Sequence, residues 1–155
     1  MTSDTDTMHD MDTSNRNVAH IVGRVLFCSV FLGAALNKIA HYDVATGGKR
    51  LVWEGTEMGS RMDAFLLHMN AMGLPIPLEK AWYPALMVVA ILLELVGSIL
   101  LIMNRALGAR MLLVFVAAVT LIMHPAHEDD HEGMVHFYKN VSLAGGLIMY
   151  LAAAP

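Results

Sequence analysis

Charged residues are scarce in this chain, and their scarcity argues against a soluble domain. Asp, Glu, Lys and Arg make up 15% of the 155 residues, whereas a typical soluble domain carries about 25%. Hydrophobic residues make up 56%, and the mean hydropathy is +0.53. The net charge of −4 gives no sign of a nucleic-acid partner. The composition therefore predicts one integral membrane domain whose first partner is the lipid bilayer.

Cysteine and targeting signals are also lacking. Cys28 is the single cysteine, so no intrachain disulfide can form, and its apolar surroundings indicate a small buried residue. Residues 1–17 have neither the basic start and apolar run of a secretory signal nor the Arg-rich, acid-poor composition of a transit peptide. They are polar and acidic, and cannot bury enough apolar area to order alone. We expect a tail at residues 1–17 and a membrane domain at 18–155.

Four apolar segments predict four crossings of the membrane. A crossing of the hydrocarbon core, about 30 Å thick, takes roughly 17–25 residues. A soluble four-helix bundle would need charged faces at helical period, and Met111–Met123 offers none. The predicted fold is all-α, a bundle of four transmembrane helices. The expected spans are Val18–Ala40, Ala81–Met103, Ala106–His124 and Phe137–Ala154.

The connection between the first two spans contains a further helical pattern. Within Arg61–Met72, four apolar residues share one helical face, and Pro75 and Pro77 end the pattern before the second span. We expect a short amphipathic helix at the membrane interface. The four apolar residues are Phe65, Leu66, Met69 and Met72.

Glu94 stands out because it lies near the middle of the second span. A charge at that depth costs at least about 2.5–3.5 kcal/mol, so the group should be paired or protonated. Counting helical rise from the nearer face predicts Arg24, or else Arg110, as its partner. Such a pair is either a structural clamp, which we favour, or a polar site for a quinone head group, a proton or a small ligand.

Two polar pairs lie at the opposite membrane face. Asn37 and Lys38 end the first span, and Lys139 and Asn140 begin the fourth. They could form a polar mouth above the bundle, although such residues more often extend to the lipid head groups.

A histidine-rich segment joins the third and fourth spans. His127 and His131 match the H-E-x-x-H spacing of zinc proteases, but that motif requires a long helix and a third ligand. We favour a solvated loop over a structural or adventitious metal site. The candidate ligands are His124, His127, His131 and His136.

Several short motifs, in order along the spans, resemble the DoxX-like superfamily of small four-helix membrane proteins. That superfamily includes the plant HR-like lesion-inducing proteins and the surfeit-locus cargo receptors. The resemblance covers roughly residues 20–154, and the chain departs from it in its acidic tail and histidine-rich loop. The motifs are Gly23-Arg-Val-Leu-Phe27, Asn37-Lys38, Glu94 followed by Gly97, and Phe137-Tyr-Lys-Asn with Leu143-Ala-Gly-Gly-Leu147.

The resemblance implies the fold more firmly than the activity. Some members of the superfamily are membrane subunits of a thiosulfate:quinone oxidoreductase, and others are cargo receptors. We expect a non-catalytic subunit or scaffold that assembles with other membrane-protein subunits and is not an enzyme on its own. The alternative is a quinone-interacting, redox-associated membrane subunit that uses the polar site around Glu94. A quinone or a lipid is the expected ligand class, and the organelle stays open between the mitochondrial inner membrane and the endomembranes.

Overall fold

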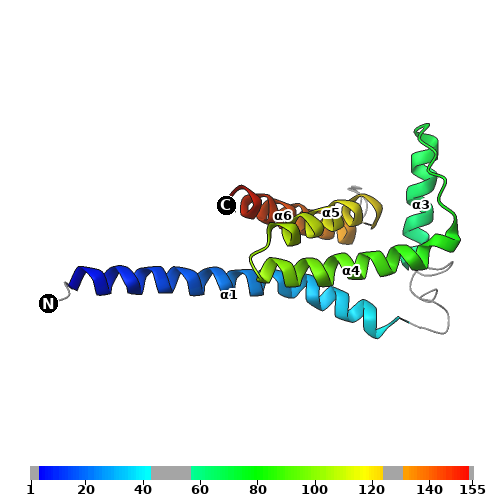
Figure 1. The fold of residues 1–155 in the computed structure, drawn as a ribbon. Coiled ribbons are helices and arrows are strands. Elements are labelled where there is room, and N and C mark those ends of the chain that lie inside the picture. The colour runs from blue at the N-terminus through cyan, green and yellow to red at the C-terminus, as the bar shows by residue number, and fades with distance from the viewer. Residues whose placement is uncertain (1–3, 43–56, 124–130, 154–155) are drawn as a thin grey trace.

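The computed structural model describes residues 4–42, 57–123 and 131–153 (Figure 1). Within those ranges all regular secondary structure is helical, which confirms the all-α prediction. The elements are α1 (Asp4–Ala40), α3 (Glu57–Ala71), the 3-10 turn η2 (Lys80–Trp82), α4 (Tyr83–Ile102), α5 (Ala106–Met123) and α6 (His131–Ala153).

Three of these helices are long and apolar enough to cross a membrane, not the four that the sequence predicted. They cover Asn17–Ala40, Lys80–Ile102 and Ala106–Met123. Helix α6 has 23 residues, so length is not the reason that it falls short. Its first half carries the polar residues Lys139, Asn140 and Ser142, which lower the mean hydropathy of the helix.

The four long helices form two antiparallel pairs, α1 with α4 and α5 with α6 (Figure 1). Their most extensive contacts are α4 with α5, α1 with α4, and α5 with α6. Helix α6 also meets α1, since a Cβ at Gly146 would lie 3.0 Å from the Phe27 ring. The shared core contains Cys28, Phe31, Leu101, Ala109, Leu112, Phe115, Val116 and Leu147.

Two glycines allow α4 and α5 to approach closely next to the turn that joins them. A Cβ on Gly108 would lie 2.4 Å from the backbone nitrogen of Leu101 and 2.5 Å from the carbonyl oxygen of Gly97. Both neighbours are backbone atoms, so any side chain here would push the two helices apart. The turn itself places Asn104 in the left-handed region, at φ 61°.

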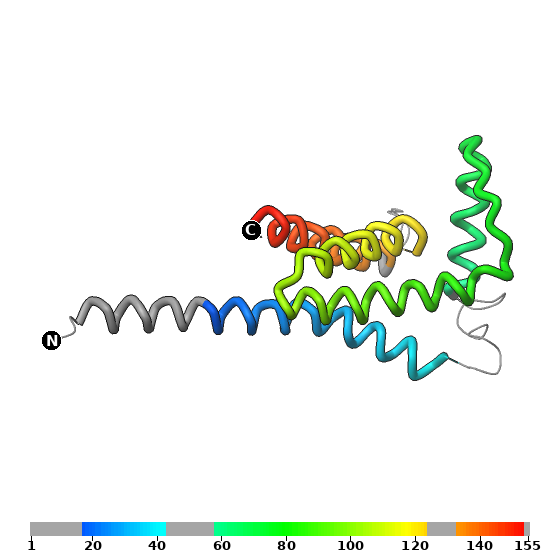
Figure 2. The backbone as a smooth tube through the Cα atoms, viewed as in Figure 1, coloured from blue at the N-terminus to red at the C-terminus, as the bar shows by residue number. Residues whose placement is uncertain are grey.

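Helix α1 extends well beyond the rest of the bundle. Its backbone is helical from Asp4, so most of the expected tail continues the first span as helix. Figure 1 shows this part of α1 projecting past the ends of the other helices, and Figure 2 shows the rest of α1 running beside α4. At about 1.5 Å per residue, 37 residues span about 55 Å, more than the hydrocarbon core of about 30 Å.

Helix α3 confirms the expected helix between the first two spans but packs through a different stripe. It runs across the direction of α4 (Figure 1). Met62 is buried, with Met58 and Leu66 packed around the same cluster, whereas Met72 is 54% exposed. The helix begins at Glu57 and its first turns pack on the bundle, so the buried residues are those of the first turns that face the bundle. That the face from Phe65 to Met72 meets the membrane interface stays a prediction.

Candidate intramembrane polar site

Glu94 pairs with Lys38 of α1. The Lys38 ammonium donates to both carboxylate oxygens, at 2.8 Å to Oε1 and 2.7 Å to Oε2. The Glu94 side chain is 1% exposed and that of Lys38 is 15% exposed. The expectation that Glu94 is paired is therefore confirmed, but the choice of Arg24 or Arg110 as its partner was wrong.

The helix register explains why lysine is the partner. The Cys28 thiol donates to the Ser98 carbonyl at 3.6 Å, which sets these two residues at one level. Measured along the helix axes from that level, Lys38 lies about 15 Å and Glu94 about 6 Å toward the same end of the bundle. Arg24 lies about 6 Å toward the opposite end. Side chains on a helix lean toward its N-terminus, and α1 and α4 are antiparallel. Lys38 and Glu94 therefore lean toward one another, and Arg24 leans away.

The two arginines lie elsewhere. Arg24 donates to the side-chain oxygen of Asn104, which also accepts from the Tyr150 hydroxyl at 2.9 Å. This contact ties α1 and α6 to the turn between α4 and α5. Arg110 is exposed on α5. Neither cation reaches the level of Glu94, because both belong to the opposite end of the bundle.

A cavity of about 300 Å³, the central cavity, adjoins the ion pair. Three of the four predicted mouth residues, Lys38, Lys139 and Asn140, line it together with Glu94. The fourth, Asn37, is exposed and is not among the lining residues. The remaining lining comes from Val30, Phe31, Ala34, Met58, Arg61, Phe115, Val116, Val119, Met123, His136 and Leu143.

Asn140 is the polar group in this cavity whose bonding is incomplete. It is 5% exposed, and its Nδ2 has no hydrogen-bond partner in the part of the chain that the structure describes. Buried amide groups are almost always hydrogen-bonded. The cavity thus presents an unused donor on α6 along with the ion pair between α1 and α4.

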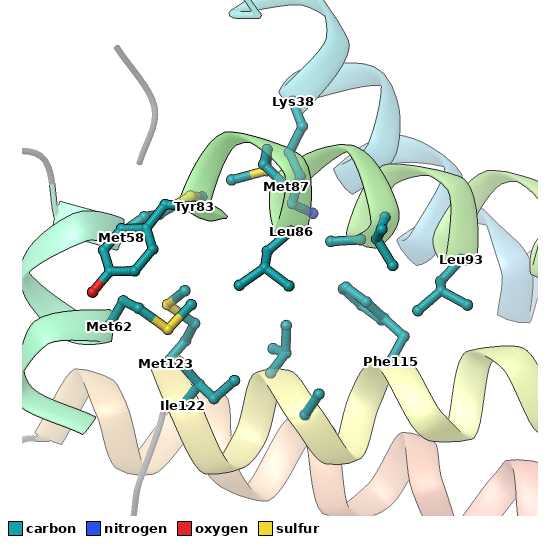
Figure 3. Close-up of a pocket in the computed structure, with 14 residues that line it drawn as sticks. Lys38, Met58, Met62, Tyr83, Leu86, Met87, Leu93, Phe115, Ile122 and Met123 are labelled. Atoms are coloured by element: carbon teal, nitrogen blue, oxygen red, sulfur yellow. The ribbon is translucent and has the colours of Figure 1, made fainter. Parts of the chain in front are cut away.

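A second cavity of about 200 Å³, the lateral groove, lies between α4 and α5, with α3 at one end of it (Figure 3). Its walls are almost wholly apolar, and the Lys38 side chain reaches it from α1. The Lys38 ammonium also lies 5.4 Å from the centre of the Phe115 ring, a cation–π contact. Both cavities are lined by Lys38, Met58, Phe115, Val119 and Met123, so they adjoin.

Polar contacts hold α3 over these cavities. The Tyr83 hydroxyl donates to Asp63 at 2.7 Å, and Lys80 pairs with Asp63 at 3.0 Å. The Tyr83 hydrogen bond, followed by Lys80, lowers the pKa of the Asp63 carboxyl below its ordinary value. Arg61 donates to the Met123 carbonyl at 2.6 Å. We call the Asp63–Tyr83–Lys80 group the α3 latch.

The model of a family described as HR-like lesion-inducing matches residues 17–153. The chain belongs to the HR-like lesion-inducing family. No curated protein and no solved structure matches it. The match begins at Asn17 and so leaves out most of the acidic start of α1.

The wider DoxX-like resemblance stays a prediction for this member of the family. The metal hypothesis also stays untested. His124 and His127 lie outside the described residues, as does the side chain of His131. The Nδ1 of His136 lies 3.2 Å from the Lys139 ammonium. Within the described ranges no three His, Cys, Asp or Glu side chains gather as metal ligands.

Sequence reasoning missed the α3 latch and the role of Arg61. A signal was available, because Asp63 is the one carboxylate of Arg61–Met72 and Lys80 precedes the second span. The contact of Arg61 with a helix-ending carbonyl had no signal in the sequence, because it depends on where α5 ends.

Proposed function

We propose that this protein crosses the membrane four times and acts as a non-catalytic subunit or scaffold of a larger membrane assembly. The fourth crossing is supported by the reach of α6 along the bundle. Tyr150 contacts the α4–α5 turn at one end, and Asn140 lines the central cavity toward the other. The cavity thus keeps the buried amide of Asn140 away from lipid, which lets a helix of modest apolarity cross.

The Lys38–Glu94 pair is the observation that carries the non-catalytic role. A general base must reach the proton that it removes from a substrate. Both oxygens of Glu94 accept from one ammonium, and the side chain is 1% exposed. The carboxylate is thereby occupied in joining α1 to α4. A buried pair of this kind is costly to break from one side.

The surface of α1 supports assembly with other membrane proteins. In an apolar stretch of 18 residues within its span 17% are buried, against 33% for the equivalent stretch of the span that contains α4 and 28% for α5. Large apolar side chains are exposed along α1, and in membranes helices associate through such surfaces by close packing. In the first half of the span, which begins at Asn17, the exposed ones are Val18, Ile21, Val22, Val25 and Leu26.

Purification from native membranes in mild detergent tests this proposal. We expect a defined complex larger than the single chain. Leu26→Trp on α1 should reduce that complex, because the bulky ring blocks the packing face. Leu121→Trp on α5 is the matched control, since Leu26 and Leu121 are 66% and 67% exposed. A chain that migrates alone, after gentle extraction and after cross-linking in the membrane, would contradict the proposal.

A quinone-interacting, redox-associated membrane subunit is the second candidate. It is favoured by the position of Lys38 and Glu94, which line a cavity beside an apolar groove suited to a long tail. Organic extraction of the purified protein should then yield a quinone, and Glu94→Gln should lower its amount. A protein that neither carries a quinone nor binds an added one would exclude this candidate.

A further inference from the structure

We propose that the protein binds the phosphate group of a membrane phospholipid at Arg24, with one acyl chain of the lipid lying between α1 and α6. The site is formed by two adjoining clefts at the end of the bundle where α4 turns into α5. Arg24 lines neither the central cavity nor the lateral groove, so the site is separate from both. The inference goes beyond the scaffold role and does not depend on it.

The first cleft, the head-group cleft of about 540 Å³, collects polar side chains from α1, α6 and the α4–α5 turn. Asn17, His20 and Arg24 follow one another at helical spacing, so they share one stripe of α1. Asn104 comes from the turn and Tyr150 from α6. The turn and the C-terminal end of α6 lie where α1 leaves the bundle (Figure 1). In a bilayer, a turn that joins two spans lies at the level of the lipid head groups.

The Arg24 guanidinium has donors that the fold leaves unused. Its Nη1 donates to the side-chain oxygen of Asn104, a neutral group, and this is its one hydrogen bond or ion pair in the described part of the chain. Its Nε is buried and has no hydrogen-bond partner there. Nε and Nη2 form the edge of a guanidinium that can bridge two oxygens of a phosphate. A phosphate at this edge would remove the cost of the unsatisfied donor.

Two further features favour an oxyanion. The Asn104 oxygen that accepts from Arg24 also accepts from the Tyr150 hydroxyl at 2.9 Å, so the guanidinium is held in place before a ligand binds. Among the described residues that line either cleft, none is Asp or Glu. These residues thus offer a cation without a carboxylate that would compete for it.

The second cleft, the acyl cleft of about 230 Å³, continues from the head-group cleft between α1 and α6. Both clefts are lined by His20, Arg24 and Tyr150, so they adjoin. Gly23 leaves the acyl cleft open, because a Cβ there would meet nothing within 4 Å. Polarity falls from one cleft to the next as it does from the phosphate of a phospholipid to its chains, and free phosphate would leave the apolar part unfilled. The apolar side chains of the acyl cleft include Phe27, Leu101 and Leu147.

Lipid binding to the purified full chain, delipidated in a neutral detergent, tests the inference. Native mass spectrometry counts the molecules that stay bound as each probe is added. Dioleoylphosphatidylglycerol supplies the phosphate and the chains, dioleoylglycerol the same chains without phosphate, and inorganic phosphate the head alone. We expect saturable binding of phosphatidylglycerol at a single site, at least about tenfold tighter than binding of either other probe.

One pair of variants locates the phosphate. Arg24→Gln should weaken phosphatidylglycerol binding at least about tenfold, because it removes the charge and the bridging edge. Arg110→Gln is the control, since Arg110 is an exposed cation that lines neither cleft, and it should leave binding unchanged.

A second pair locates the acyl chain. Gly23→Leu should weaken phosphatidylglycerol binding several-fold, because the new side chain fills the acyl cleft. Gly33→Leu is the matched control: both glycines are exposed on α1, a Cβ at either meets nothing within 4 Å, and Gly33 lines neither cleft. Both variants should keep the wild-type melting temperature, so they test the site even if Arg24→Gln, which loses its contact with Asn104, unfolds more readily.

Four outcomes would overturn the inference. They are the absence of saturable phosphatidylglycerol binding, equally tight binding of dioleoylglycerol or inorganic phosphate, equal binding by Arg24→Gln and Arg110→Gln, and equal binding by Gly23→Leu and Gly33→Leu. A chain that purifies without partner proteins would change none of these results, so the two proposals can fail separately.

Discussion

Lys38 and Glu94, 56 residues apart in the chain, meet in an ion pair with two hydrogen bonds between α1 and α4. The two partners are unequally buried, at 15% and 1% exposure. A lysine left alone could extend toward the nearby membrane face, whereas a carboxylate left alone would stay enclosed. The pair should therefore respond asymmetrically to removal of either side.

We expect Lys38→Met to destabilise the protein more than Glu94→Leu does. Breaking a buried pair from one side costs about 3–5 kcal/mol, and Glu94→Leu should fall toward the low end of that range. The double variant Lys38→Met/Glu94→Leu should recover most of the loss, because no charge remains buried. Unfolding in detergent micelles measures the free energy of unfolding of all three variants. If both single variants unfold like the wild type, the pair is not the clamp that we describe.

The contact of α4 with α5 at Gly108 provides a second prediction. Gly108→Ala should cost at least about 1–3 kcal/mol, because the new methyl group would meet backbone atoms of α4 at 2.4 and 2.5 Å. Gly145→Ala is the control, since a Cβ there meets nothing within 4 Å. Thermal unfolding of the two variants should differ clearly. Equal stability would mean that α4 and α5 are farther apart than the structure indicates.

The α3 latch should weaken in acid. Because the folded-state pKa of Asp63 is lowered, its stabilising effect is fully present above the ordinary value of 3.8 and is lost as pH falls from there through the lowered pKa. Asp63→Asn should lower the unfolding temperature at pH 7 and have a smaller effect at pH 3. The difference should be small, about 0.2–1 kcal/mol, because the pair with Lys80 is partly exposed. If Asp63→Asn destabilised the protein more at pH 3 than at pH 7, the ionised Asp63 carboxylate would not be what stabilises the α3 latch.

Sequence reasoning located the helices well because apolar runs depend on local composition. The predicted spans that begin at Ala81 and Ala106 correspond to η2 with α4 and to α5 within about two residues. Glu94 was identified as an interior residue for the same reason, since a charge in an apolar run needs a partner.

The partner of Glu94 was missed because its choice depends on the register between two helices. Counting helical rise from the membrane face placed Arg24 close to the depth of Glu94 and Lys38 far from it. That count left out the tilt of side chains toward the N-terminus of each helix. The contact between Cys28 and Ser98, which sets that register, has no local signature. The stripe of α3 that packs on the bundle likewise depends on its contacts with Tyr83 and Met87.

Membrane topology is the most direct test of the four-crossing bundle. Tags at the two ends of the chain, probed by protease in sealed vesicles of one orientation, report the side on which each end lies. Four crossings predict that both tags are accessible from the same side and protected from the other. Tags on opposite sides would mean that α6 does not cross, and would contradict the account.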